Sequence, residues 1–223
     1  MVTDVDACDA RLCYLLLGAS AAICQAPLMF TIPSNSDMSF PPLTCKVLEE
    51  YSIRPPKNEN LWLGPWLTIL TTLFPADNYL VSTQIKTYSE RDAKGRPDLI
   101  LEVAKPLDQP FGLRTILIVE IKNPHHWPDG VDHIMRRIDL DTGYEFSKTA
   151  LNKVYWIAAI GPHWQYGIRE EDERRARPLI DWHHSVHDAA SFTALQALAT
   201  LVRALQASDT TASHCLTISF CLP

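Results

Sequence analysis

Positively charged residues are fewer than negatively charged residues in this chain. Among its 223 residues, 20 are lysine or arginine and 26 are aspartate or glutamate, which gives a formal net charge of −6. Proteins that coat nucleic acid through bulk electrostatics have the opposite balance. The charge argues against that class, but it is compatible with an enzyme whose carboxylates bind a metal cation.

Signatures of zinc modules and phosphate loops are also missing. The six cysteines form no C-x-x-C pair and no cluster with histidine, and there is no Gly-rich phosphate loop. This pattern favours a reduced protein inside the cell, in the cytoplasm or nucleus. His183 and His187 would be i, i+4 on a helix, but no further ligand at a supporting spacing completes a zinc site. Surface histidines are the default interpretation of that pair.

An apolar run near the N-terminus, Leu12 to Ile23, is too short to span a bilayer. The residues before it, Met1 to Arg11, carry three aspartates and one arginine, which is the wrong charge for a signal peptide. We therefore expect a helix over about 9–26 or a poorly ordered leader, and no membrane partner.

Hydrophobic periodicity and proline-marked breaks divide the chain into three parts. Residues 1–58 are an N-terminal extension with a second short helix near 46–51, residues 59–207 are one domain, and residues 208–223 are a tail. In the domain, apolar residues at i, i+3, i+4 spacing predict helices, and alternating or continuous apolar runs predict strands. The predicted helices are 61–74, 131–151 (with Gly143 as a candidate break) and 192–205, and the predicted strands are 79–87, 99–104, 113–121, 155–160 and 164–169. This order predicts an α/β domain with a mixed central sheet flanked by helices.

The main chemical signal is charge at the ends of two apolar strands. Pro97-Asp98 precedes the strand 99–104, and Glu120-Ile121-Lys122 closes the strand 113–121. Burying a charge is costly unless it is paired or bound to a metal. One aspartate, one glutamate and one lysine at a sheet edge therefore predict a site that binds a divalent metal and activates water. The competing interpretation is a surface ion pair, which contributes little to stability.

Alternation along a strand predicts which residues accompany this pair. Glu120 and Lys122 share one face because side chains two residues apart point to the same side. Ile116 and Ile118 are expected on that face too, so that the charged pair closes an otherwise apolar surface.

The order of elements, with Pro97-Asp98 opening the second strand and Glu120-x-Lys122 closing the third, resembles the PD-(D/E)xK, or restriction-endonuclease-like, nuclease superfamily. The resemblance covers about residues 59–169. It implies an α-β-β-β-α-β core and hydrolysis of phosphodiester bonds in DNA or RNA with Mg²⁺ or Mn²⁺. The alternative is a catalytically inactive member that serves as a nucleic-acid-binding or protein-binding module, since a fold does not imply a function.

A narrower pattern is similar to restriction-endonuclease-like proteins common in fungi. In that group a Glu-led helix ends in Leu-Phe-Pro, as at 73–75 here, and the next strand carries a glutamine, as at Gln84. The third strand then ends in E-I-K, and the fourth runs into an Ile-Gly turn with nearby aromatic residues, here within 158–164.

The resemblance implies a role for each matching residue. Asp98 and Glu120 would be metal ligands, and Lys122 would orient or activate the attacking water and neutralise charge on the phosphate. Glu59 would be the acid of the first helix that completes the metal site, with Glu49 and Glu50 as rivals.

Three further positions are candidates beside these. Gln84 would support the metal site. Arg136, with Arg137, follows the site closely enough to contact a phosphate, although a solvated helix face is the simpler interpretation. His125-His126-Trp127 either lines a substrate groove or closes a loop.

Overall fold

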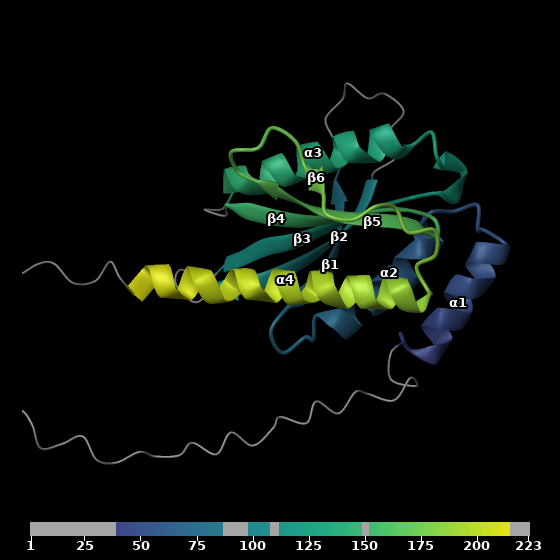
Figure 1. Cartoon of the computed structure of the whole chain (residues 1–223), viewed down its shortest axis with the longest axis horizontal. Coiled ribbons are helices and arrows are strands. Elements are labelled where there is room, and N and C mark those ends of the chain that lie inside the picture. Colours follow the sequence, from purple (N-terminus) through teal and green to yellow (C-terminus); the bar gives the residue numbers. More distant parts are fainter. Residues whose placement is uncertain (1–38, 87–97, 108–111, 149–151, 215–223) are drawn as a thin grey trace, which may run out of the picture. The chain divides into compact units, whose positions relative to one another are not determined.

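The computed structural model describes residues 39–86, 98–107, 112–148 and 152–214 (Figure 1). At positions 85–86, 98–99, 107, 148 and 206–214 it describes the backbone only. The expected helix over 9–26, the charged turn after the first strand and most of the C-terminal tail lie outside the described residues.

The helices and strands of the described chain follow one another much in the order that the periodicity predicts. The helices are α1 (Pro42–Ile53), α2 (Asn60–Leu73), the short 3-10 helix η2 (Pro124–His126), α3 (Val131–Lys148) and α4 (Ala189–His214). The strands are β1 (Leu80–Lys86), β2 (Asp98–Leu107), β3 (Gly112–Lys122), β4 (Lys153–Ile160), β5 (His163–Glu170) and the two-residue β6 (Arg177–Pro178).

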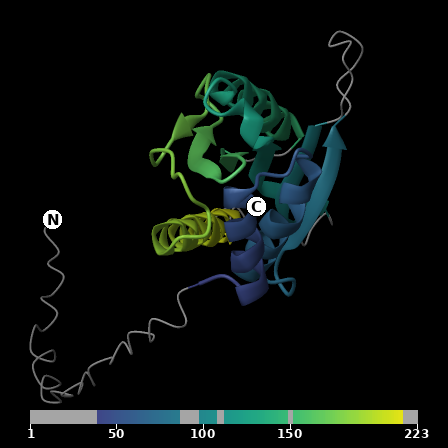
Figure 2. The same ribbon diagram turned by 90° about the vertical axis from the view of Figure 1, so that its right-hand side faces the viewer.

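The strands form one mixed sheet in the order β1-β2-β3-β4-β5-β6. Neighbours pair antiparallel except β3 and β4, which are parallel and are joined through α3. Helix α3 lies on one side of the sheet, and α2 and α4 lie on the other (Figures 1 and 2). The predicted α/β class with a mixed sheet between helices is confirmed.

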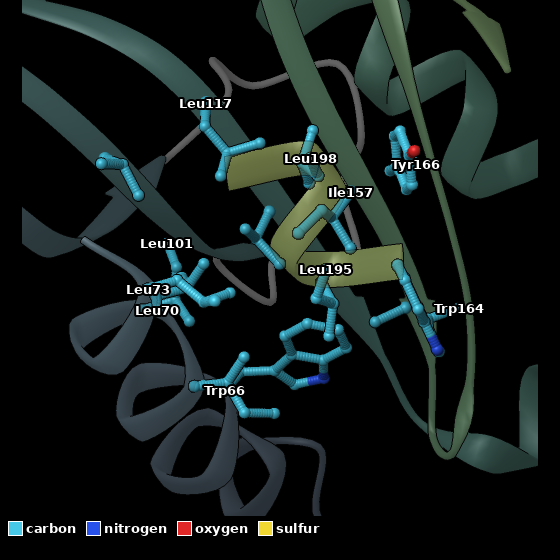
Figure 3. Packing of buried hydrophobic residues seen from close by; sticks show 14 of the residues in the cluster. Trp66, Leu70, Leu73, Leu101, Leu117, Ile157, Trp164, Tyr166, Leu195 and Leu198 are labelled. Carbon is cyan, nitrogen blue, oxygen red and sulfur yellow. The ribbon is translucent and has the colours of Figure 1, made fainter. Parts of the chain in front are cut away.

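The larger core lies between the sheet and helices α1, α2 and α4. Trp66 and Leu70 of α2 and Leu195 and Leu198 of α4 are almost completely buried here, against side chains of the central strands (Figure 3). Their i, i+3, i+4 spacing places one stripe of each helix on the sheet. Helix α1, which the sequence assigns to the extension, adds Leu48 to the same cluster.

A smaller core lies under α3. Ile134 and Ile138 of that helix pack against Trp156, Ala158 and Ile160 of β4. Because β3 and β4 alternate in phase, the even-numbered residues at the end of β3 face α3 as well. This face carries the candidate site.

Two local expectations differ from the structure. Helix α3 runs without a break through Gly143. The segment 183–187 is not helical, so His183 and His187 do not share a helix face.

Within the described ranges, no helix combines the length and apolarity needed to cross a membrane.

Candidate metal centre

Glu120 and Lys122 form a buried ion pair at the end of β3. The Nζ of Lys122 lies 2.8 Å from Oε1 of Glu120, and the two residues are 6% and 0% exposed. Ile100 of β2 and Ala158 of β4 flank Glu120 on either side, so the strand is central and both of its faces are covered. The surface ion pair, the simpler interpretation of these two residues, is therefore wrong.

Burial determines the electrostatics of Glu120. It raises the pKa of this carboxyl to about 7 because the charged form loses its hydration, and Lys122 only partly opposes the effect. The negative charges of Asp141 and Glu59 raise the pKa further. Oε2 of Glu120 is buried and has no hydrogen-bond partner among the described residues. A desolvated carboxylate oxygen beside other acids fits a ligand of a divalent cation.

Glu59 reaches this site from the start of α2. It is the N-cap residue of that helix and half-buried, whereas Glu49 and Glu50 are exposed on α1. The end of β3 is tied to the preceding linker, because Nδ2 of Asn123 donates a hydrogen bond to the carbonyl oxygen of Lys57. Of the three candidate acids of the first helices, Glu59 is the one whose charge acts on Glu120.

Asp98 is placed by its backbone alone. It is the first residue of β2 and pairs with Lys86, and Ile100, two residues on, is directly opposite Glu120. The register therefore places Asp98 at the same sheet edge as the end of β3, on the face of Ile100 and Glu120. Its side chain lies outside the described residues, so a close approach of the Asp98 and Glu120 carboxylates stays a prediction.

Gln84 contacts a second buried glutamate that sequence reasoning missed. Its Nε2 donates to Oε2 of Glu102, which is 1% exposed, and the hydroxyl of Thr115 donates to the same oxygen at 3.2 Å. Glu102 lies on β2 two residues beyond Ile100, on the face of Glu120. An acidic residue in the middle of an apolar strand could have indicated that Glu102 is buried.

Helix α3 adds two more buried acids. Asp141 and Glu145 are 1% and 2% exposed, and they continue the stripe that Ile134 and Ile138 begin. Extending that apolar stripe by a further helical turn would have found them. Four buried carboxylates, those of Glu102, Glu120, Asp141 and Glu145, therefore accompany Lys122 on the α3 side of the sheet.

The arginines of α3 divide between solvent and interior. Arg136, the expected phosphate contact, is exposed, and its Nε donates to the backbone oxygen of Asp132 in its own helix at 3.2 Å. Arg137 is half-buried with a buried Nε, one turn before Asp141. Of the two, Arg137 is the one directed away from solvent.

The apolar residues next to the pair differ from the expectation. The pairing of β2 and β3 shifts between Val103 and Ala104, so that Leu117 and Thr115 face consecutive residues and Ile116 is an extra residue in β3. This β-bulge turns Ile116 into the larger core on the opposite face. The expected sharing of one face by Ile116, Ile118 and Glu120 is wrong for Ile116.

His183 and His187, the candidate zinc ligands, contact other side chains. His183 stacks on Trp164, with Nδ1 3.3 Å from the hydroxyl of Ser191, and Nδ1 of His187 lies 3.0 Å from that of Ser185. In the described part of the chain, no group of three or more histidine, cysteine or acidic side chains is arranged to hold a metal ion. This absence does not extend to the side chain of Asp98, which lies outside the described part of the structure.

Known proteins offer no guide to this site. Family models, curated proteins and solved structures all fail to match the chain. Carboxylate oxygens, the donors gathered on this face, suit a hard cation such as Mg²⁺ or Mn²⁺ better than a soft one.

Proposed function

We propose that this protein is a metal-dependent nuclease with a PD-(D/E)xK-type site. Asp98, Glu120 and Glu59 would hold Mg²⁺ or Mn²⁺, and Lys122 would act on the attacking water. The observation that carries the proposal is the buried Glu120–Lys122 pair, in which one carboxylate oxygen has no hydrogen-bond partner among the described residues and the charge of Glu59 acts on the same carboxyl.

The order of elements supports the same proposal. Helix α2, strands β1 to β3, helix α3 and strand β4 follow one another, with β1, β2 and β3 antiparallel and β4 parallel to β3. This order supports the proposal, because an α-β-β-β-α-β core is what the resemblance to the PD-(D/E)xK superfamily implies. Asp98 at the start of β2 and Glu120 near the end of β3 support it in the same way.

The chain's own residues would divide the work of hydrolysis. A bound divalent cation supplies a polarised phosphate and a water of lowered pKa. Glu120 holds the ammonium group of Lys122 through Oε1, and Oε2 would be its metal ligand. Lys122 is thereby held in one orientation, and its charge would offset the negative charge that develops on a phosphate. Asp141 and Glu59 keep the local potential negative enough to attract a cation.

A substrate panel tests the proposal. We expect the purified chain to cleave single-stranded or double-stranded DNA or RNA in Mg²⁺ or Mn²⁺, and to stop when EDTA removes the metal. The Glu120→Gln variant should lose the cleavage, and Glu171→Gln, an exposed acid beyond β5, should keep it. Cleavage that survives Glu120→Gln would come from a contaminant or another site, and absence of cleavage of every substrate would overturn the proposal.

The second candidate is an inactive fold that binds nucleic acid or protein. The net charge of −6 favours the protein-binding form of this alternative, because an acidic surface gives the chain little help in attracting nucleic acid. Metal-dependent cleavage that is lost in Glu120→Gln would exclude this alternative.

A further inference from the structure

Four partly exposed rings gather on the α3 side of the sheet, and we call them the aromatic cluster. They belong to Trp127, His163, Trp182 and His184. Trp127 stacks on His163 with ring centroids 4.1 Å apart and planes 17° from parallel. His184 stands edge-on to both rings, and Trp182 stands edge-on to Trp127 at 5.0 Å.

The register of the sheet places this cluster beside the candidate metal centre. Lys122 of β3 pairs with Ile160 of β4, and Ile160 pairs with His163 of β5. Residues in one row of a sheet point to the same face, so His163 and Lys122 are neighbours two strands apart, which corresponds to about 10 Å. Trp127 reaches the cluster from the loop that follows Lys122 and η2.

The cluster is accessible from solvent and suited to contact with a flat, uncharged surface. His184 is exposed, and the other three rings are half-buried. Burial and the neighbouring His184 both lower the pKa of His163, which favours its neutral imidazole. The Nδ1 atoms of His163 and His184 lie 3.3 Å apart, a contact that also requires at least one neutral ring.

We propose that the aromatic cluster stacks against a nucleobase of single-stranded nucleic acid whose neighbouring phosphate lies at Glu120 and Lys122. This inference rests on the proposed function and names its substrate class. Bases in a duplex are already stacked on each other, whereas those of a single strand are free to stack on aromatic side chains. In a chain of net charge −6, stacking supplies affinity that phosphate contacts alone would not.

Oligonucleotides with and without bases test this inference. The probes are a labelled oligo-dT and an abasic strand of the same length, so that both carry the same phosphates. Binding is measured by fluorescence anisotropy, with Ca²⁺ in place of Mg²⁺, and tryptophan fluorescence reports stacking independently. The variants are His184→Ala, which removes an exposed ring, and Trp127→Phe, which keeps a smaller one. His187→Ala, on the same loop but outside the cluster, is the control.

We expect the full chain to bind oligo-dT at least about tenfold more tightly than the abasic strand, which corresponds to about 1.4 kcal/mol. His184→Ala should weaken oligo-dT binding severalfold and leave binding of the abasic strand unchanged. Equal affinity for both strands, or no effect of His184→Ala and Trp127→Phe, would overturn the inference while metal-dependent cleavage persists. If no strand is bound and none is cleaved, the proposed function and this inference fail together.

Discussion

Replacing Lys122 with methionine should lower kcat for metal-dependent cleavage by about 10²–10³-fold, the usual effect of losing one preorganised charge at a reacting centre. The ammonium group is held at 2.8 Å from Glu120 and is almost fully buried, so water cannot replace it. Methionine fills a similar volume without the charge. Single-turnover cleavage in saturating Mg²⁺ measures the loss.

Metal affinity should respond differently from kcat in the same variant. Lys122 neutralises Glu120 and therefore competes with a cation for that carboxylate. Mn²⁺ should bind Lys122→Met at least as tightly as the parent chain. The matched control is Lys153→Met, which removes a half-exposed lysine paired with Glu170 at 3.1 Å. A tenfold loss of Mn²⁺ affinity in Lys122→Met, with kcat unchanged at saturation, would contradict this role.

The second large effect is on stability. Replacing Glu120 with glutamine should raise the free energy of unfolding of the metal-free protein at pH 8 relative to its effect at pH 5. The direction follows from a pKa of about 7 in the folded chain against an ordinary value of 4.5. Between those pH values the folded state keeps a proton that the unfolded state has released. The free energy of unfolding therefore falls as pH rises from 4.5 to 7, and glutamine removes this contribution.

Urea unfolding at pH 5 and pH 8, in EDTA, tests this prediction. The difference between Glu120→Gln and the parent chain should be small at pH 5 and reach its full size at pH 8. Saturating Mn²⁺ should then stabilise the parent chain and not the variant, because a ligand stabilises the state that binds it. A variant that is less stable than the parent at pH 8 would show that the carboxylate is held by favourable contacts instead of strained by burial.

A carboxylate that destabilises the empty protein is what a functional site predicts. Sites that bind or react often retain groups that weaken the fold. The Glu120–Lys122 pair is buried although an apolar pair of similar volume would commonly cost nothing or even stabilise the fold. Its presence at the end of the central strand therefore agrees with the proposed metal site.

Local patterns were enough to predict the elements and the buried pair. The alternation in 79–87 and the apolar runs that follow define the strands, and the spacing in α2 defines the helix that precedes them. Glu120 and Lys122 share a face because alternation is a local property of a strand. The charge of Glu59 acts on the carboxyl of Glu120, and its expected role as a metal ligand stays a prediction.

The missed features depend on contacts between distant residues. The bulge that moves Ile116 to the opposite face arises in the pairing of β3 with β2. No residue within β3 indicates it. Three acidic residues occupy positions on otherwise apolar faces: Glu102, Asp141 and Glu145. Only the packing of α3 on the sheet shows that they are buried. The aromatic cluster joins the loop after β3 with β5 and the segment after β6, which sequence spacing does not relate.

Isothermal titration of the purified chain with Mn²⁺ tests the central claim most directly. The account predicts binding that both Glu120→Gln and Asp98→Asn weaken by at least about tenfold, since each removes a charged oxygen ligand. Glu120→Gln is expected to be more stable than the parent chain, so its loss of affinity would not reflect unfolding. Mn²⁺ affinity that is the same in the parent chain and in both variants would contradict a metal centre at the end of β3.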